Sequence, residues 1–196
     1  MHVHPTSRWL FKCWKDEYMA EVITWLVGQG IKVVVTSSPD KKEMDKAKRI
    51  LSLVSEVTPL MLPHLPERSI RGVIDLCGKT TIKQLAAISE ASILFFGVDS
   101  APMHIAASVG TPVVALFGPS AAFNWGPWDK NCPYEYGKKS GIQEAGKHMV
   151  IQNHRDCIPC RKDGCNGTKI SQCLESIKVE EVKKLLSEKL GKITEN

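Results

Sequence analysis

The stretch SILFFGVDSAPMHIAASVGTPVVALFG, residues 92–118, decides the fold class. Two short apolar runs within it, residues 92–97 and 111–118, have the composition of strands that are buried on both faces. Residues 102–109 between them form a helical pattern of small side chains. A strand, a helix and a second strand in this order predict a parallel βαβ unit.

The same alternation continues on both sides of this stretch. Helices are predicted at residues 15–28 and 39–54 and from Thr80, strands at residues 31–36, 72–76 and 148–152, and a terminal amphipathic helix at residues 177–190. Residues 58–71, which contain three prolines, and residues 136–147 are predicted as loops. The pattern predicts the α/β class, with a doubly wound, Rossmann-like parallel sheet that binds ligands at the carboxyl ends of its strands.

Length and composition fit one globular domain of 196 residues, with 43% hydrophobic and 24% charged residues. The sequence starts without a signal-peptide pattern, and no apolar run approaches the roughly 18–20 residues that cross a bilayer. We therefore expect a cytoplasmic protein. The net charge of +5 is spread along the chain and no nucleic-acid-binding motif is present, so we expect no nucleic-acid partner.

The turn after residues 92–97 carries the strongest signal of a binding site. Asp99 and Ser100 lie where the strand ends, and Pro102 suits the first turn of the next helix. Free N–H groups at a helix start favour an anion such as a pyrophosphate, and a carboxylate there can accept hydrogen bonds from sugar hydroxyls. The alternative is that Asp99 and Ser100 only cap the helix.

Four stretches carry a resemblance to a known family. The segment VDSAPMHIAASVGTPVVALFGPS, residues 98–120, closely resembles the donor-binding segment of glycosyltransferase family 9, the heptosyltransferases of lipopolysaccharide core assembly. Residues 4–14 are similar to the opening loop of the second domain of that family, and residues 33–43 agree as well. The cysteine-rich residues 157–173 are similar to the branch called heptosyltransferase III.

This resemblance implies a fold and a function. Residues 1–196 would be the nucleotide-sugar-binding, C-terminal half of a GT-B glycosyltransferase, without the N-terminal acceptor domain. The implied reaction is inverting transfer of heptose from ADP-heptose to the lipopolysaccharide inner core, with no cofactor required for catalysis. The acceptor and the general base would belong to the missing domain, so this chain alone would be inactive. Peripheral association with the inner face of the inner membrane is also implied.

The resemblance also assigns roles to the first part of the chain. Thr6 and Ser7 would hold the diphosphate, and Lys12 would neutralise it and stabilise the leaving nucleotide. Glu43 matches a carboxylate that holds the nucleoside through ribose hydroxyls. The alternatives are a solvated surface lysine at position 12 and an ordinary glutamate in the first turn of a helix at position 43.

Later residues complete the implied donor site. Asp99 matches the acidic residue that contacts the donor sugar, and Ser100 and Ala101 would present backbone N–H groups to phosphate. His104 would reach the same diphosphate or pack against the opening loop. The aromatic side chains of Trp125 and Trp128, with Phe123, would line the cleft entrance or clamp the long loop after residue 118.

The cysteine-rich loop, residues 153–173, has three alternative interpretations. Cys157, Cys160, Cys165 and Cys173 could hold a structural zinc ion, although their spacing lacks the second CxxC of a zinc ribbon. Disulfides are disfavoured in a reducing cytosol, and free structural thiols are the simplest alternative.

Two other functions also fit a domain of this class. A sugar-nucleotide 2-epimerase would share the architecture, but it would need further acid–base residues in the cleft. A non-catalytic nucleotide-sugar-binding or interaction module would need none. His2 and His4 are interpreted as flanking residues without a role.

Overall fold

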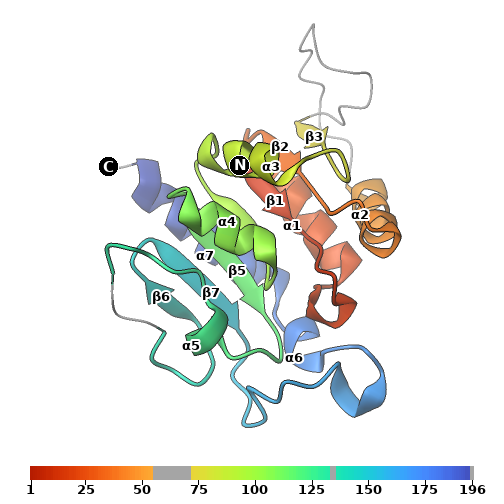
Figure 1. The fold of residues 1–196 in the computed structure, drawn as a ribbon, viewed down its shortest axis with the longest axis vertical. Helices are drawn as coiled ribbons and strands as arrows, with labels where there is room; N and C mark the ends of the chain where they lie inside the picture. Colours follow the sequence, from red (N-terminus) through yellow and green to blue (C-terminus); the bar gives the residue numbers. More distant parts are fainter. Residues whose placement is uncertain (55–71, 133–135, 195–196) are drawn as a thin grey trace, which may run out of the picture.

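The computed structural model describes residues 1–54, 72–132 and 136–194 (Figure 1). In this part of the chain, a seven-stranded sheet has the order β3-β2-β1-β4-β5-β7-β6. Its strands are β1 (His2–His4), β2 (Val33–Val35), β3 (Val73–Asp75), β4 (Phe95–Val98), β5 (Val113–Phe117), β6 (Gln143–Ala145) and β7 (His148–Gln152). Neighbouring strands are parallel except β6, which pairs antiparallel with β7. The predicted doubly wound sheet is confirmed.

Helices cover both faces of this sheet. They are α1 (Asp16–Gly28), α2 (Lys41–Leu53), α3 (Ile82–Glu90), α4 (Ala101–Ser108), α5 (Ala122–Trp125), α6 (Gln172–Glu175) and α7 (Val179–Thr194), with short 3-10 helices η1 (Leu10–Lys12) and η2 (Cys165–Gly167). Helix α1 contacts α2 and α7, whereas α3 contacts α4. Figure 1 shows α4 in front of the sheet and α7 behind it.

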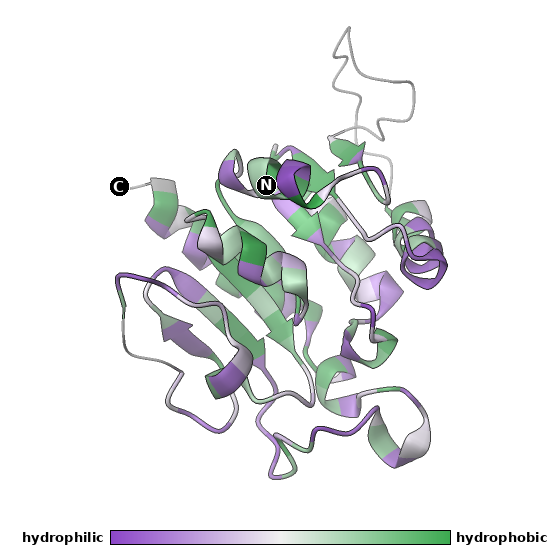
Figure 2. Cartoon of the chain, in the orientation of Figure 1, coloured by the Kyte–Doolittle hydropathy of each residue, from purple (hydrophilic) through white to green (hydrophobic). Residues whose placement is uncertain are grey.

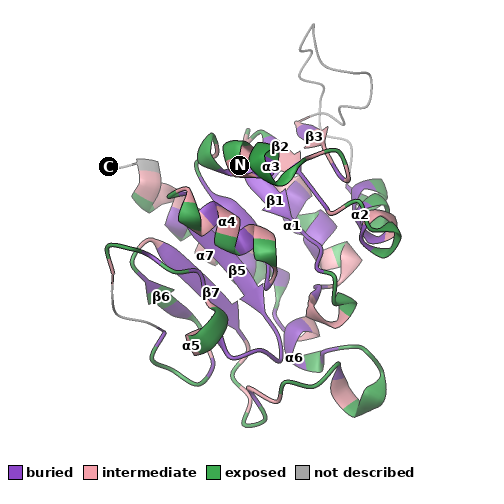
Figure 3. Cartoon of the chain, in the orientation of Figure 1, coloured by how far each residue is buried: buried purple, intermediate pink, exposed green. Residues whose placement is uncertain are grey.

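Strands β4 and β5 are apolar and buried on both sides, and each side belongs to a separate core. Phe96 packs with the side chains of α1, α2 and α7, whereas its neighbour Phe95 packs with Met103 and Ala106 of α4. This alternation follows from the period of two in a strand. Figures 2 and 3 show the result, because the central strands are both hydrophobic and buried while the outer face of α2 is hydrophilic and exposed.

Helix starts follow the local sequence. Asp40 caps α2 by accepting hydrogen bonds from the backbone of Lys42 and Glu43 at 2.9 and 3.3 Å. Thr81, one residue after the predicted start at Thr80, caps α3 in a reciprocal capping box with Gln84. Helix α4 begins after Ser100, but the Ser100 hydroxyl donates to the Val98 carbonyl at 3.1 Å and makes no cap bond.

Three predictions about single segments need correction. Residues 136–147 are not entirely loop, since they contain β6. The terminal helix starts at Val179 and runs beyond the predicted end at residue 190. His2 and His4 do not flank the fold but belong to β1, an interior strand of the sheet. The loop predicted at residues 58–71 lies outside the described residues. In the described ranges, no helix is both long and apolar enough to cross a bilayer.

Candidate functional site

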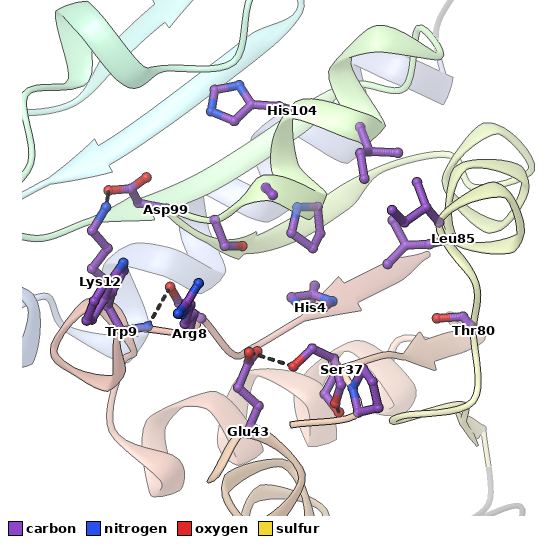
Figure 4. Close-up of a pocket in the computed structure, with 18 of the residues that line it drawn as sticks. His4, Arg8, Trp9, Lys12, Ser37, Glu43, Thr80, Leu85, Asp99 and His104 are labelled. Atoms are coloured by element: carbon purple, nitrogen blue, oxygen red, sulfur yellow. Dashed lines mark hydrogen bonds and ion pairs between the residues drawn. The ribbon is translucent and has the colours of Figure 1, made fainter. Parts of the chain in front are cut away.

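A cleft of about 540 Å³ opens at the carboxyl ends of β1, β2 and β4. From β1 the chain proceeds to β2 on one side, while β4 lies on the other side of β1, so the direction of winding reverses between β1 and β4. Open α/β sheets bind ligands at such a switch point. Of the residues expected in the donor site, the cleft is lined by Ser7, Lys12, Glu43, Asp99, Ser100, Ala101 and His104 (Figure 4).

The loop after β1 brings a cation to the end of β4. Lys12, the last residue of η1, donates a hydrogen bond to Asp99 Oδ2 at 2.8 Å. The side chain of Asp99 is only 7% exposed, so its carboxylate has little contact with water and is paired with Lys12 instead. Figure 4 shows the two side chains meeting at one edge of the cleft. Lys12 is therefore not a solvated surface lysine.

Glu43 is fixed by two hydroxyl groups from neighbouring loops. Thr6 Oγ1 donates to Glu43 Oε2 at 2.7 Å, and Ser38 Oγ donates to Glu43 Oε1 at 2.6 Å. Each carboxylate oxygen retains a lone pair for a further donor. Thr6 is fully buried and does not line the cleft, so its hydroxyl orients Glu43.

The first turn of α4 forms the wall beyond Asp99. Ser100 and Ala101 line the cleft at the start of this eight-residue helix, where the helix dipole favours negative charge. His104 lies one turn later and faces the same cleft (Figure 4). Desolvation at the cleft wall lowers the pKa of His104, and the Asp99 charge opposes that shift. We infer that His104 is neutral near pH 7.

The structure adds residues that the sequence did not single out. Ser37 and Ser38 follow β2, and Thr80, Ile82 and Leu85 come from the start of α3. The turn signal Ser-Ser-Pro-Asp before α2 could have identified the first two, because parallel strands end at the same edge of a sheet. Ile82 and Leu85, with Ile105 of α4, give one part of the cleft an apolar lining.

The aromatic group after β5 is divided between two cavities. Trp125 lines the cleft, as expected for its entrance. Trp125 also lines a neighbouring cavity of about 290 Å³, together with Trp128, Phe123 and His104. Both tryptophans are more than half exposed, so neither acts as a buried clamp.

The four cysteines of residues 153–173 are the possible zinc ligands named from the sequence. Among the described residues, no group of three or more His, Cys, Asp or Glu side chains is placed to hold a metal ion. All four thiols are free; Cys157 is exposed and Cys173 is buried. The segment is held by docking instead, since Ile158 is fully buried and Ser171 Oγ donates to the Phe11 carbonyl at 2.6 Å. The geometry favours free structural thiols.

Comparison with known proteins fits this arrangement. The model of glycosyltransferase family 9 (heptosyltransferase) matches residues 1–170. This chain belongs to that family. It is similar to lipopolysaccharide heptosyltransferase 3 of Escherichia coli, with 39% identity over 130 residues, which are 66% of this chain and 34% of the relative. It is also 30% identical over 165 residues to the lipopolysaccharide core heptosyltransferase OpsX of Haemophilus influenzae, covering 76% of this chain and 43% of the relative.

Solved structures show the same fold. The structure of E. coli ADP-heptose LPS heptosyltransferase II has a TM-score of 0.68 at 22% identity, covering 97% of this chain and 46% of that one. E. coli heptosyltransferase WaaC with ADP has a TM-score of 0.64 at 17% identity, covering 96% of this chain and 43% of that one. The family 9 chain described here thus spans less than half the length of these proteins.

Proposed function

We propose that this family 9 chain is the donor-binding part of an inverting heptosyltransferase that transfers heptose from ADP-heptose to the lipopolysaccharide inner core. One observation carries the proposal: Lys12, Glu43, Asp99 and the first turn of α4 meet in a single cleft at the switch point of the sheet. The relatives are heptosyltransferases by name, and the WaaC structure contains ADP.

Each part of the proposed donor has a complementary part of the cleft. The diphosphate would lie between Lys12 and the N–H groups at the start of α4. Ribose hydroxyls would donate to Glu43, whose oxygens are already oriented by Thr6 and Ser38. The adenine would contact the apolar lining formed by Ile82, Leu85 and Ile105, and the sugar hydroxyls would donate to Asp99.

The proposed reaction is a single in-line displacement at the anomeric carbon. The acceptor hydroxyl forms the new bond as the bond to the ADP oxygen breaks, and its proton passes to a base. Lys12 and the α4 N–H groups stabilise the negative charge that develops on ADP. We place the acceptor and the base outside these 196 residues, in a part that corresponds to the remaining length of the relatives. The reaction would take place in the cytoplasm, at the inner face of the inner membrane.

Calorimetric titration with ADP, UDP and ADP-heptose tests the proposal. We expect ADP to bind more tightly than UDP. Lys12→Ala should weaken ADP and ADP-heptose alike, by about 1–3 kcal/mol, the range for a hydrogen bond to a charged group. Asp99→Ala should weaken ADP-heptose more than ADP, because its proposed partner is the sugar and its loss frees Lys12 for the diphosphate. Lys183→Ala, which removes an ion pair to Glu21 away from the cleft, is the matched control.

The outcomes separate the parts of the proposal. A wild-type chain that binds none of the three ligands would refute donor binding. Equal affinities in Lys12→Ala and wild type would remove the role of Lys12. Heptosyl transfer to a truncated lipopolysaccharide by the chain alone would show that the base lies within these residues.

A further inference from the structure

A hydrogen-bonded series of buried polar side chains runs from α3 through the sheet to the cleft. Ser89 Oγ lies 2.9 Å from His2 Nδ1, and His2 Nε2 lies 2.7 Å from Thr36 Oγ1. Thr36 Oγ1 lies 2.8 Å from His4 Nδ1. The first three side chains are fully buried and His4 is 2% exposed. Polar groups buried in this way must be hydrogen-bonded to be tolerated, so their protons are arranged in a definite order.

This hydrogen-bonded series ends at the cleft. His4 is the last residue of β1 and lines the cleft, with Asp99 and Glu43 on neighbouring walls. Figure 4 shows its imidazole among the labelled cleft side chains, between Asp99 and Ser37. Among the described residues, its Nε2 atom has no hydrogen-bond partner, while its Nδ1 atom is taken by Thr36. His4 Nε2 is therefore available to water or to a ligand in the cleft.

The hydroxyl of Thr36 couples the two histidines. It has one hydrogen and contacts a ring nitrogen on each side, so it donates to one histidine and accepts from the other. Burial lowers the pKa of His2 to about 4 and that of His4 to about 3, with a further lowering of His4 by His2. Both rings are therefore neutral near pH 7, and each carries one N–H.

Two proton orders satisfy all three contacts between these side chains, and the hydroxyl hydrogen of Ser89 distinguishes them. In the first, Ser89 donates to His2 Nδ1, His2 Nε2 donates to Thr36, and Thr36 donates to His4 Nδ1. His4 then presents its Nε2–H to the cleft. In the reverse order, the Ser89 hydrogen needs another acceptor, and among the described residues Ser89 Oγ has no partner besides His2. An unused buried donor is costly, so the first order is favoured.

We propose that His4 is a further ligand-binding residue whose Nε2–H donates to an oxygen of the bound nucleoside diphosphate, and that Ser89, His2 and Thr36 position it by fixing its tautomer. This inference rests on the proposed function for the class of ligand. In this proposal His4 acts as a neutral hydrogen-bond donor, and the positive charge that faces the diphosphate comes from Lys12. The proposal also gives a reason for the two buried histidines in β1, an interior strand of the sheet.

Matched variants of His4 and Thr36 test the proposal with ADP as the ligand. His4→Phe and Thr36→Val should each raise the Kd for ADP about threefold to tenfold, as expected for the loss of one neutral hydrogen bond. His4→Gln retains a donor and Thr36→Ser retains the hydroxyl, so both should stay within about twofold of wild type. His154→Phe, at an exposed histidine outside the cleft, should leave the Kd unchanged.

Nitrogen-15 NMR of the imidazole rings gives a readout that general destabilisation would not move. In the wild-type chain, with and without ADP, the proton of His4 should reside on Nε2, and in Thr36→Val it should distribute over both nitrogens. A proton on Nδ1 in the wild-type chain overturns the inference even where a variant fails to fold. If wild type and folded His4→Phe bind ADP equally, the inference about His4 is overturned but the proposed function is not. If the wild type binds no ADP, both are overturned.

Discussion

Replacing Gly97 with alanine tests how tightly the sheet is packed beside the cleft. Gly97 pairs with His4 across β1 and β4. An added Cβ would lie 2.6 Å from the His4 carbonyl oxygen and 2.9 Å from Cε1 of Phe95. Neither neighbour has room to move, because one is backbone in an interior strand and the other belongs to a fully buried ring.

The expected loss of stability follows from these contacts. Adding a methyl group to a well-packed interior costs about 1–3 kcal/mol, and we expect the upper end because a backbone atom must move. In a domain of this size each kcal/mol corresponds to about 2–4 °C, so Gly97→Ala should lower the Tm by about 6–12 °C. Displacement of His4 should also weaken ADP binding.

Gly191→Ala is the matched control for this substitution. Gly191 lies inside α7, where no heavy atom comes within 4 Å of the added Cβ. Alanine at such a helical position should raise the free energy of unfolding by about 0.5–1 kcal/mol. Urea denaturation followed by circular dichroism measures both. A Gly97→Ala variant within about 0.5 kcal/mol of wild type would show that β1 and β4 separate easily, which would refute the packing argument.

Two further predictions concern buried groups elsewhere. Burial lowers the pKa of His2 and His148 to about 4 and of His4 to about 3. Their neutral forms therefore stabilise the fold above pH 6.5, and this stabilisation is lost as the pH falls from 6.5 toward the folded-state pKa. At pH 5 the free energy of unfolding should be lower by about 2 kcal/mol per histidine. Equal stabilities in urea denaturation at pH 7.5 and 5.0 would contradict this. Cys173→Ser replaces a buried thiol and should lower the free energy of unfolding by about 1–3 kcal/mol. Cys157→Ser replaces an exposed thiol and should change that free energy by less than about 0.5 kcal/mol. Similarly large losses of stability in both variants would indicate a shared metal ion.

The fold was largely predictable because its strands are buried on both faces. Residues 92–97 and 111–118 read as continuous apolar runs, and β4 and β5 lie within or beside them. The end of β4 also indicated Asp99 and Ser100, since a polar turn between a buried strand and a helix lies at the edge where α/β sheets bind ligands, whereas Ala101 was indicated by the family resemblance. Strand β6 was missed because three residues at the edge of a sheet leave no clear periodicity.

The interactions that fix individual side chains were not predictable from local patterns. The resemblance assigned Thr6 to the diphosphate, and nothing in the sequence indicated that its hydroxyl donates to Glu43, 37 residues away. His2 and His4 looked irrelevant because two histidines do not resemble a buried strand, and their partners Thr36 and Ser89 become visible only when β1, β2 and α3 are packed together. Likewise, the cysteine spacing gave no information about the distances between thiols.

The ion pair between Lys12 and Asp99 has a consequence for the proposed donor site. Asp99 is paired with the cation that the diphosphate would need, at 2.8 Å and largely away from water. Under the proposed function, a diphosphate would compete with Asp99 for Lys12, which would lower the affinity for ADP alone. A donor with its sugar attached would offer Asp99 hydroxyl groups as replacement partners, so the competition would be weaker for the substrate than for the product. Once the sugar had been transferred, Asp99 would lose those hydroxyls and attract Lys12 again, which would favour the release of ADP.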